Sequence, residues 1–128
     1  MMANNETGVV QDITQIGELC KKYESIFHTD VAQSIGTLKV DVIEMNIDAL
    51  SLSGHKIYGP KGVGALFVAN SIKNTLRPLM SGGGQEQNLR SGTLSPALCI
   101  GIGEACKDIK KNRDKYFKHF KKIKSALL

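Results

Sequence analysis

The sequence has 128 residues, of which 41% are hydrophobic and 23% are charged, values ordinary for one soluble globular domain. No apolar run approaches the length of a membrane span, and the first residues lack a signal-peptide pattern. We therefore expect no membrane partner, and a cytoplasmic location or, in a eukaryote, an organelle matrix.

The net charge of +5 is uneven: residues 107–128 carry nine Lys and Arg against two Asp. A basic segment on a near-neutral body argues against nucleic acid as a partner.

The three cysteines are Cys20, Cys99 and Cys106. They form no CxxC pair and no Cys/His set with the spacing of a metal site. Cys99 and Cys106 are seven residues apart, on one face of a helix. We expect free thiols, buried or half-buried, in a reducing compartment, and no bound metal.

The first third of the chain predicts a helix between two extended segments. Residues 1–8 end in a polar, glycine-terminated stretch, as a strand running into a loop does. Asp12 is a suitable N-cap for a helix that ends near Tyr23 and has apolar residues at helical spacing. The apolar pair Ile26 and Phe27 then predicts a buried strand, and the end of that strand delivers Asp30.

The rest of the chain alternates strands, turns and a long helix. In order, we expect a helical turn over 31–36, a strand over 49–53 stopped by Gly54, a strand over 65–68, an exposed and flexible turn over 81–84, and a helix from Pro96 to the end with a break or bend near Asn112. Gly101 and Gly103 lie inside this helical pattern, so they indicate close helix packing rather than a nucleotide-binding loop.

This alternation predicts an α/β fold with a mostly parallel sheet. In such sheets ligands bind beyond the carboxyl ends of the strands. Asn5, Asp30 and residues 53–56 each follow a predicted strand. They are therefore expected to face one crevice with an amide, a carboxylate and a Ser/His/Lys cluster.

Lys56 is the candidate for covalent chemistry. A lone lysine is most often a solvated surface residue. Here it lies in the string SGHKIYGPKG, residues 53–62, just beyond a strand and close to a glycine that lets the backbone approach a ligand. A partly desolvated lysine in such a place can serve as a Schiff-base lysine.

The string over 53–62 resembles the cofactor-lysine motif of the cysteine desulfurases. These belong to the class V aminotransferase group of fold-type I pyridoxal-phosphate enzymes. Three further strings resemble motifs of the same family: NNETG over 4–8, HTDVAQSIG over 28–36, and GGGQEQNLRSGT over 82–93. The resemblance covers essentially the whole chain without gaps.

The resemblance implies a role for each candidate residue in holding pyridoxal phosphate. Lys56 would bind the cofactor covalently and later transfer a proton. Asp30 would pair with the pyridine nitrogen and keep it protonated, so that the ring draws electrons. Gln33 and Asn5 would hydrogen-bond the side of the ring that bears the phenolic oxygen.

The resemblance also implies how the phosphate is held and in what assembly. Ser53 and His55 would contact the phosphate. Thr93 would reach the phosphate bound in a neighbouring subunit, which implies a homodimer. The implied reaction converts L-cysteine to L-alanine and passes the sulfur to an enzyme cysteine as a persulfide. An iron–sulfur scaffold or another sulfur-acceptor protein, or the machinery of tRNA thiolation, would then receive it.

The sequence also departs from the family. Gln87 and Asn88 stand where members usually carry Arg-Gly, and none of the three cysteines lies in a Ser/Gly-rich loop. In the family, the phosphate-cradling turn and the ring-stacking histidine lie upstream, and the persulfide cysteine and carboxylate-binding arginine lie downstream. We therefore expect an internal fragment or truncated member, inactive alone. Residues 1–95 would be the second half of the large cofactor domain, and 96–128 a basic helix leading toward the small domain.

Two alternatives stay open. The chain could derive from another class V enzyme, such as a selenocysteine lyase. It could also be a non-catalytic relic that binds a partner through its basic C-terminal helix.

Overall fold

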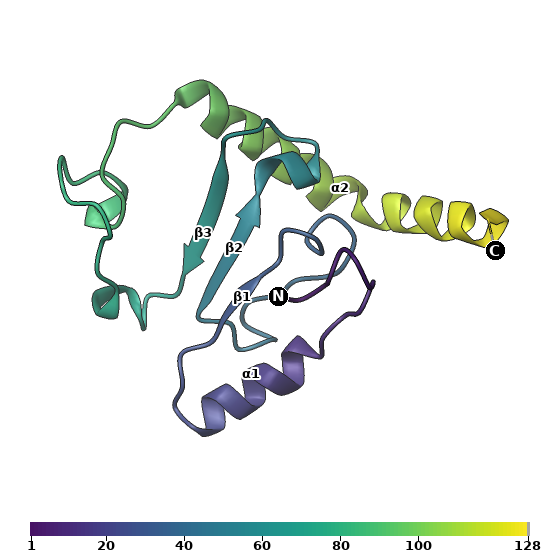
Figure 1. Cartoon of the computed structure of the whole chain (residues 1–128), viewed down its shortest axis with the longest axis horizontal. Coiled ribbons are helices and arrows are strands. Elements are labelled where there is room, and N and C mark those ends of the chain that lie inside the picture. The colour runs from purple at the N-terminus through teal and green to yellow at the C-terminus, as the bar shows by residue number, and fades with distance from the viewer. Residues whose placement is uncertain (128) are drawn as a thin grey trace.

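The computed structural model describes residues 1–127 and is built on a three-stranded sheet of order β1-β2-β3 (Figure 1). The strands are β1 (His28–Asp30), β2 (Ala49–Ser53) and β3 (Gly64–Val68). β1 pairs parallel with β2, and β2 pairs antiparallel with β3. The α/β class is confirmed, and the sheet is mixed. β3 runs back beside β2 because the link between them has no crossover helix, which a parallel pairing requires.

Helix α1 (Ile13–Lys22) confirms the helix expected after Asp12. The Asp12 side chain accepts a hydrogen bond from the Gln15 backbone N–H at 3.0 Å, which satisfies one of the free donors of the first turn. Gly17 is buried on the inner face, where an added Cβ would overlap the Met45 carbonyl group. The absence of a side chain there allows α1 to pack closely on the segment that precedes β2.

The main core lies between α1 and the sheet. Its buried members come from the chain start, α1, the two parallel strands and the segments beside them: Met2, Ile13, Phe27, Val31, Ile47 and Leu50. Ile26 is 56% exposed, so the buried extended segment begins at Phe27 and not at Ile26 as expected.

The first residues do not form the expected strand. Ala3 and Val10 make an isolated antiparallel bridge, and the Met2 N–H donates to the Asp30 carbonyl at 2.9 Å. Residues 4–8 turn back because the Asn4 side chain accepts hydrogen bonds from the backbone N–H groups of Glu6 and Thr7. A local side-chain turn thus replaces an extended ladder.

Helix α2 (Pro96–Leu127) is continuous. No break interrupts the helix at Asn112, whose side chain donates to Asp108 one turn earlier. Figure 1 shows a change in the direction of the helix axis midway along, which agrees with a bend, the other expected possibility. The N-terminal half packs on the body through Ala105 and Ile109, which contact Ile57. No helix within residues 1–127 is long and apolar enough to cross a bilayer.

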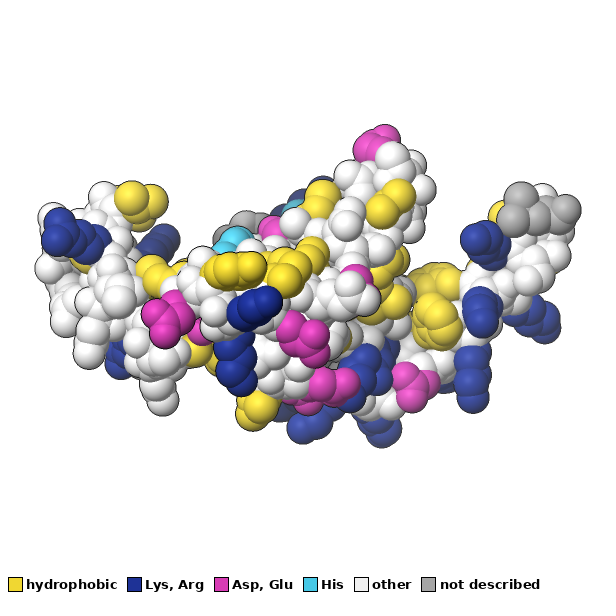
Figure 2. Space-filling model, turned by 90° about the horizontal axis from the view of Figure 1, so that it is seen from below, with side chains coloured by type: hydrophobic (Ala, Val, Ile, Leu, Met, Phe, Trp, Pro, Cys, Tyr) yellow, Lys and Arg dark blue, Asp and Glu magenta, His cyan; other side chains and the backbone are white. Residues whose placement is uncertain are grey.

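The second half of α2 extends past the body (Figure 1). Figure 2 shows a row of Lys and Arg side chains along this end of the molecule. The apolar side chains on the same segment are partly exposed, between 40% and 80%: Phe117, Phe120, Ile123 and Leu127. The basic helix expected from the sequence is therefore an exposed amphipathic helix.

The segment between β3 and α2 loops out on the side of β3 away from β1 (Figure 1). It contains the short 3-10 helices η2 (Lys73–Thr75) and η3 (Glu86–Asn88). β3 itself is mostly exposed, with Leu66 at 57% and Phe67 at 38%. Within residues 1–127, the outer edge of β3 pairs with no strand.

The cysteines are free, as expected, but their burial differs from the expectation. Cys20 is half-buried, whereas Cys99 and Cys106 are exposed on α2. Within the described part of the chain, nothing packs over the two positions of α2 that carry these thiols closely enough to bury them.

The two glycines of α2 give a matched test of how the helix packs. A Cβ added at Gly101 would lie 2.8 Å from Cγ of the Pro60 ring, whereas one added at Gly103 would have nothing within 4 Å. We expect Gly101→Ala to lower the free energy of unfolding by roughly 1–3 kcal/mol through overpacking. Gly103→Ala should raise it by up to about 1 kcal/mol through helix propensity. Urea denaturation followed by circular dichroism measures both, and equal effects would contradict the packing.

Candidate functional site

The candidate site residues gather at one edge of the sheet. β1 and β2 both end there, and β3 begins there, since Ser53 is paired with Gly64. Asp30 is the last residue of β1, opposite Ser51 of β2. The turn that carries Lys56 connects β2 to β3 at this same edge. The structure therefore brings Asp30, Ser53, His55 and Lys56 to the carboxyl ends of the parallel strands, as expected.

Asp30 is half-buried and fixed by two hydrogen bonds. Its Oδ1 accepts from the Ala32 backbone N–H at 2.9 Å, and its Oδ2 accepts from the Ser51 hydroxyl at 3.0 Å. The Val31 N–H also donates to the Ser51 carbonyl at 2.9 Å, which extends the parallel pairing by one residue. The carboxylate is thus held in one orientation and still has lone pairs for a further donor.

Lys56 lies in the 3-10 helix η1 (Gly54–Ile57), which begins where β2 ends. Gly54 is buried, and a Cβ there would lie 3.0 Å from the Val63 carbonyl oxygen. The Gly54 N–H donates to that oxygen, and the Gly54 carbonyl accepts from the Gly59 N–H, both at 2.9 Å. The turn is closed by Tyr58, whose φ of 66° is left-handed and costs energy for a non-glycine residue.

The side chains of η1 point to different environments. Ile57 is only 1% exposed and anchors the turn in the cluster with Ala105 and Ile109. Lys56 is exposed, so the partial desolvation expected for it is not provided by residues 1–127. The turn is therefore anchored by the buried Ile57 side chain, while the Lys56 amine is exposed to solvent.

Ser53 and His55 are linked to each other. Ser53 Oγ and His55 Nδ1 are 3.0 Å apart. The pair spans the junction of β2 and η1 and offers a hydroxyl and an imidazole, both of which can donate to an anion.

Within residues 1–127, the other three candidates make no hydrogen bond to this cluster. Asn5 is exposed, and its amide donates to Glu6 Oε1 at 2.8 Å. Gln33 is half-buried in the turn that follows Asp30, and its side chain has no hydrogen bond within residues 1–127. Thr93 is exposed in the segment that loops out beyond β3.

The loop before Thr93 explains one departure from the expected motif. Gln87 and Asn88 have φ values of 58° and 66°. Asparagine is one of the few residues other than glycine that adopts this left-handed conformation readily. Asn88 therefore has a backbone conformation that glycine, the residue expected here from the resemblance, would adopt as well.

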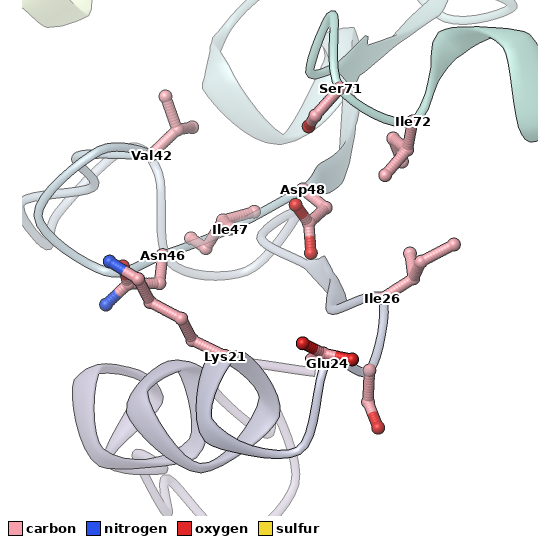
Figure 3. Close-up of a pocket in the computed structure, with 10 residues that line it drawn as sticks. Lys21, Glu24, Ile26, Val42, Asn46, Ile47, Asp48, Ser71 and Ile72 are labelled. Atoms are coloured by element: carbon pink, nitrogen blue, oxygen red, sulfur yellow. The ribbon is translucent and has the colours of Figure 1, made fainter.

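A hollow of the described chain lies at the opposite edge of the sheet. It has a volume of about 360 Å³ and lies where β1 and β2 begin and β3 ends. Figure 3 shows Asp48 directed toward the loop that follows α1, and Lys21 beside Asn46. Asp48 accepts a hydrogen bond from the Phe27 N–H at 2.9 Å, and Lys21 donates to Asn46 at 3.3 Å. These polar groups hold loops together, and the hollow is separate from Lys56.

Fold and sequence together define the class of protein. The pattern of the family described as Aminotransferase class-V matches residues 1–128. The chain therefore belongs to the class V aminotransferase family.

Within that family the similar proteins are cysteine desulfurases. The chain is 52% identical over its full length to the mitochondrial cysteine desulfurase of Saccharomyces cerevisiae, of which it covers 26%. It is 58% identical over 105 residues, or 82% of its length, to the mitosomal cysteine desulfurase of Trachipleistophora hominis, of which it covers 24%. The chain thus spans about a quarter of the length of these relatives.

Solved structures agree in fold. A structure described as a NifS-like protein superposes with a TM-score of 0.92 at 36% identity, over 99% of this chain and 35% of that one. A second, SspA in complex with cysteine, gives a TM-score of 0.79 at 52% identity, over 83% of this chain and 30% of that one.

Ser51 is the residue of this cluster that the sequence reasoning missed. The signal was present, because Ser51 and Ser53 alternate with apolar residues and so share one face of the strand. Which residue of β2 lies beside Asp30 depends on the strand register, which the sequence pattern left open.

Ser51→Ala tests the hydroxyl that holds Asp30. Removing it leaves one oxygen of a half-buried carboxylate without its partner, so we expect a loss of about 1 kcal/mol in the free energy of unfolding. Ser71→Ala is the matched control, since Ser71 is exposed and its hydroxyl has no hydrogen bond within residues 1–127. Chemical denaturation compares them, and an unchanged Ser51 variant would show that the bond contributes nothing.

Proposed function

We propose that this chain forms the lysine-bearing part of the active site of a pyridoxal-phosphate-dependent cysteine desulfurase. The observation that carries the proposal is the placement of Lys56 and Asp30 at one edge of the sheet, in a chain 52% identical to a cysteine desulfurase. The relatives' names also favour this activity over that of a selenocysteine lyase. The division into a large-domain segment (1–95) and a helix leading toward a small domain (96–128) is part of the same proposal.

The residues suit pyridoxal phosphate on structural grounds. The Asp30 carboxylate is held by Ala32 and Ser51 and retains lone pairs for a protonated pyridine nitrogen. The Lys56 amine has no ion pair within residues 1–127, so it is available for bond formation. Ser53 and His55 offer hydrogen-bond donors at the same edge, where a phosphate would be close to both.

The proposed roles follow from the chemistry of each group. Bound pyridoxal phosphate supplies an electron-withdrawing ring that weakens the bonds at the substrate α-carbon. Lys56 would bind the cofactor and, once released, hold and move a proton at its Nζ. Asp30 would keep the ring nitrogen protonated, because a fixed carboxylate stabilises the charged form of its partner.

The remaining candidates would orient the cofactor. Ser53 and His55 would donate to the phosphate, and Gln33 and Asn5 to the side of the phenolic oxygen. Thr93 would act on the phosphate in a second subunit. The outward course of its segment, on the far side of β3 from β1, is compatible with this role. The site would then belong to a homodimer.

The substrate, acceptor and location are proposed from the relatives. L-cysteine would be the substrate, since the similar structure of SspA is in complex with cysteine. An iron–sulfur scaffold or other sulfur-acceptor protein would take the sulfur. The relatives' names are mitochondrial and mitosomal, which favours an organelle matrix over the cytoplasm.

Covalent trapping tests the role of Lys56. We expect pyridoxal phosphate followed by borohydride to label Lys56 in preference to the exposed Lys61, because Lys56 directly follows β2, the strand that pairs with the Asp30 strand, whereas Lys61 precedes β3, which does not pair with β1. Peptide mass spectrometry locates the label. Lys56→Ala should abolish the visible absorption band of the bound cofactor, and Lys61→Ala should leave it intact. Equal labelling of both lysines would refute the assignment.

Turnover by the isolated chain is a separate question. The 128 residues contain no cysteine in a Ser/Gly-rich loop and correspond to about a quarter of the relatives' length. We therefore expect no measurable release of sulfide or alanine from L-cysteine in the presence of pyridoxal phosphate. Sustained production of both by this chain alone would contradict the prediction.

A further inference from the structure

A hydrogen-bonded network on α2 lies directly behind the turn that carries Lys56. The Tyr116 hydroxyl donates to Asp108 Oδ2 at 2.7 Å, and the Asn112 amide donates to Asp108 Oδ1 at 2.7 Å. The three residues are spaced four apart, so they lie on one face of the helix. All three are half-buried.

The protonation preferences of the network agree with this geometry. The Tyr116 and Asn112 hydrogen bonds lower the pKa of Asp108, and the bond to Asp108 raises the pKa of Tyr116. At neutral pH the carboxylate is therefore charged and the phenol protonated, which is the state in which the hydroxyl donates. A hydrogen bond to a charged acceptor is stronger than one between neutral groups.

The Tyr116 ring connects this network to the Lys56 turn. It meets the Tyr58 ring edge-on, with centroids 5.7 Å apart and an interplanar angle of 68°. It also packs against the cluster that contains Ile57. Tyr58 and Ile57 are the two residues that follow Lys56.

Tyr58 is the residue of the turn whose conformation needs outside support. Its left-handed backbone closes η1, and the Gly59 N–H that follows bonds back to the Gly54 carbonyl at 2.9 Å. A left-handed non-glycine residue persists only where the surroundings favour it. An edge-to-face aromatic contact stabilises the ring in one place, and Tyr58 is otherwise 70% exposed.

We propose that Tyr116, fixed by Asp108 and Asn112, is a positioning residue that holds the Lys56 turn in shape through Tyr58. The position of the Lys56 backbone would then depend on a helix that contributes no group to the candidate site. An effect of Tyr116 on function would rest on the proposed role of Lys56. The structural coupling between α2 and the turn does not depend on a bound cofactor.

Tyr116→Phe tests the coupling, because it removes the hydroxyl and keeps the ring. Amide hydrogen exchange at Gly59 reports the closure of the turn. We expect exchange there to become about fivefold faster, the effect of losing one side-chain hydrogen bond. Amides of β2 should be unaffected. Asp108→Asn keeps an acceptor oxygen and should restore part of the protection that Asp108→Ala loses. Tyr23→Phe is the matched control, because the exposed Tyr23 hydroxyl has no hydrogen bond within residues 1–127.

The outcomes separate this inference from the proposed function. Unchanged Gly59 exchange in Tyr116→Phe, or an equal increase at Gly59 and in β2, would overturn the positioning role. Borohydride labelling of the same variants gives the functional result, with a smaller labelled fraction at Lys56 expected for Tyr116→Phe than for Tyr23→Phe. If the wild type is not labelled at Lys56, the proposed function fails while the exchange result on the turn still stands.

Discussion

The parallel pairing of β1 with β2 is the constraint on which the rest of the site depends. Its register sets Asp30 opposite Ser51, and this places a hydroxyl where it fixes the carboxylate. The pairing also makes both strands end at one edge, so that the turn after β2 rises beside Asp30. A slip of one residue would reverse the faces of β2 and remove Ser51 and Ser53 from the site together.

The turn carrying Lys56 is stabilised by contacts of its backbone and of Ile57, and not by contacts of the lysine side chain. Buried Gly54 allows the backbone to fold closely against Val63 and Pro60. Ile57 anchors the turn in apolar contacts with α2. The lysine side chain itself makes none of these contacts, so the support of the turn does not compete with chemistry at the amine.

Local patterns predicted most of the elements, and long-range pairing accounts for what they missed. The helix after Asp12, the strand over 49–53 and the strand near 65–68 follow from capping and alternation, which are encoded within a few residues. The antiparallel direction of β3 and the role of Ser51 depend on how strands that are separated in the sequence pair with one another. The exposure of Lys56 could not be read from its neighbours in sequence either, because burial depends on which segments cover the sheet edge.

The open edge of β3 has a consequence for how the polypeptide behaves in solution. An edge strand whose outer side pairs with no strand in the described part of the chain, and on which Leu66 and Phe67 are exposed, is a template for pairing with an extended segment of another molecule. The strand itself, Gly64–Val68, contains no charged side chain that would oppose such pairing. Self-association through strand addition would therefore rise with protein concentration.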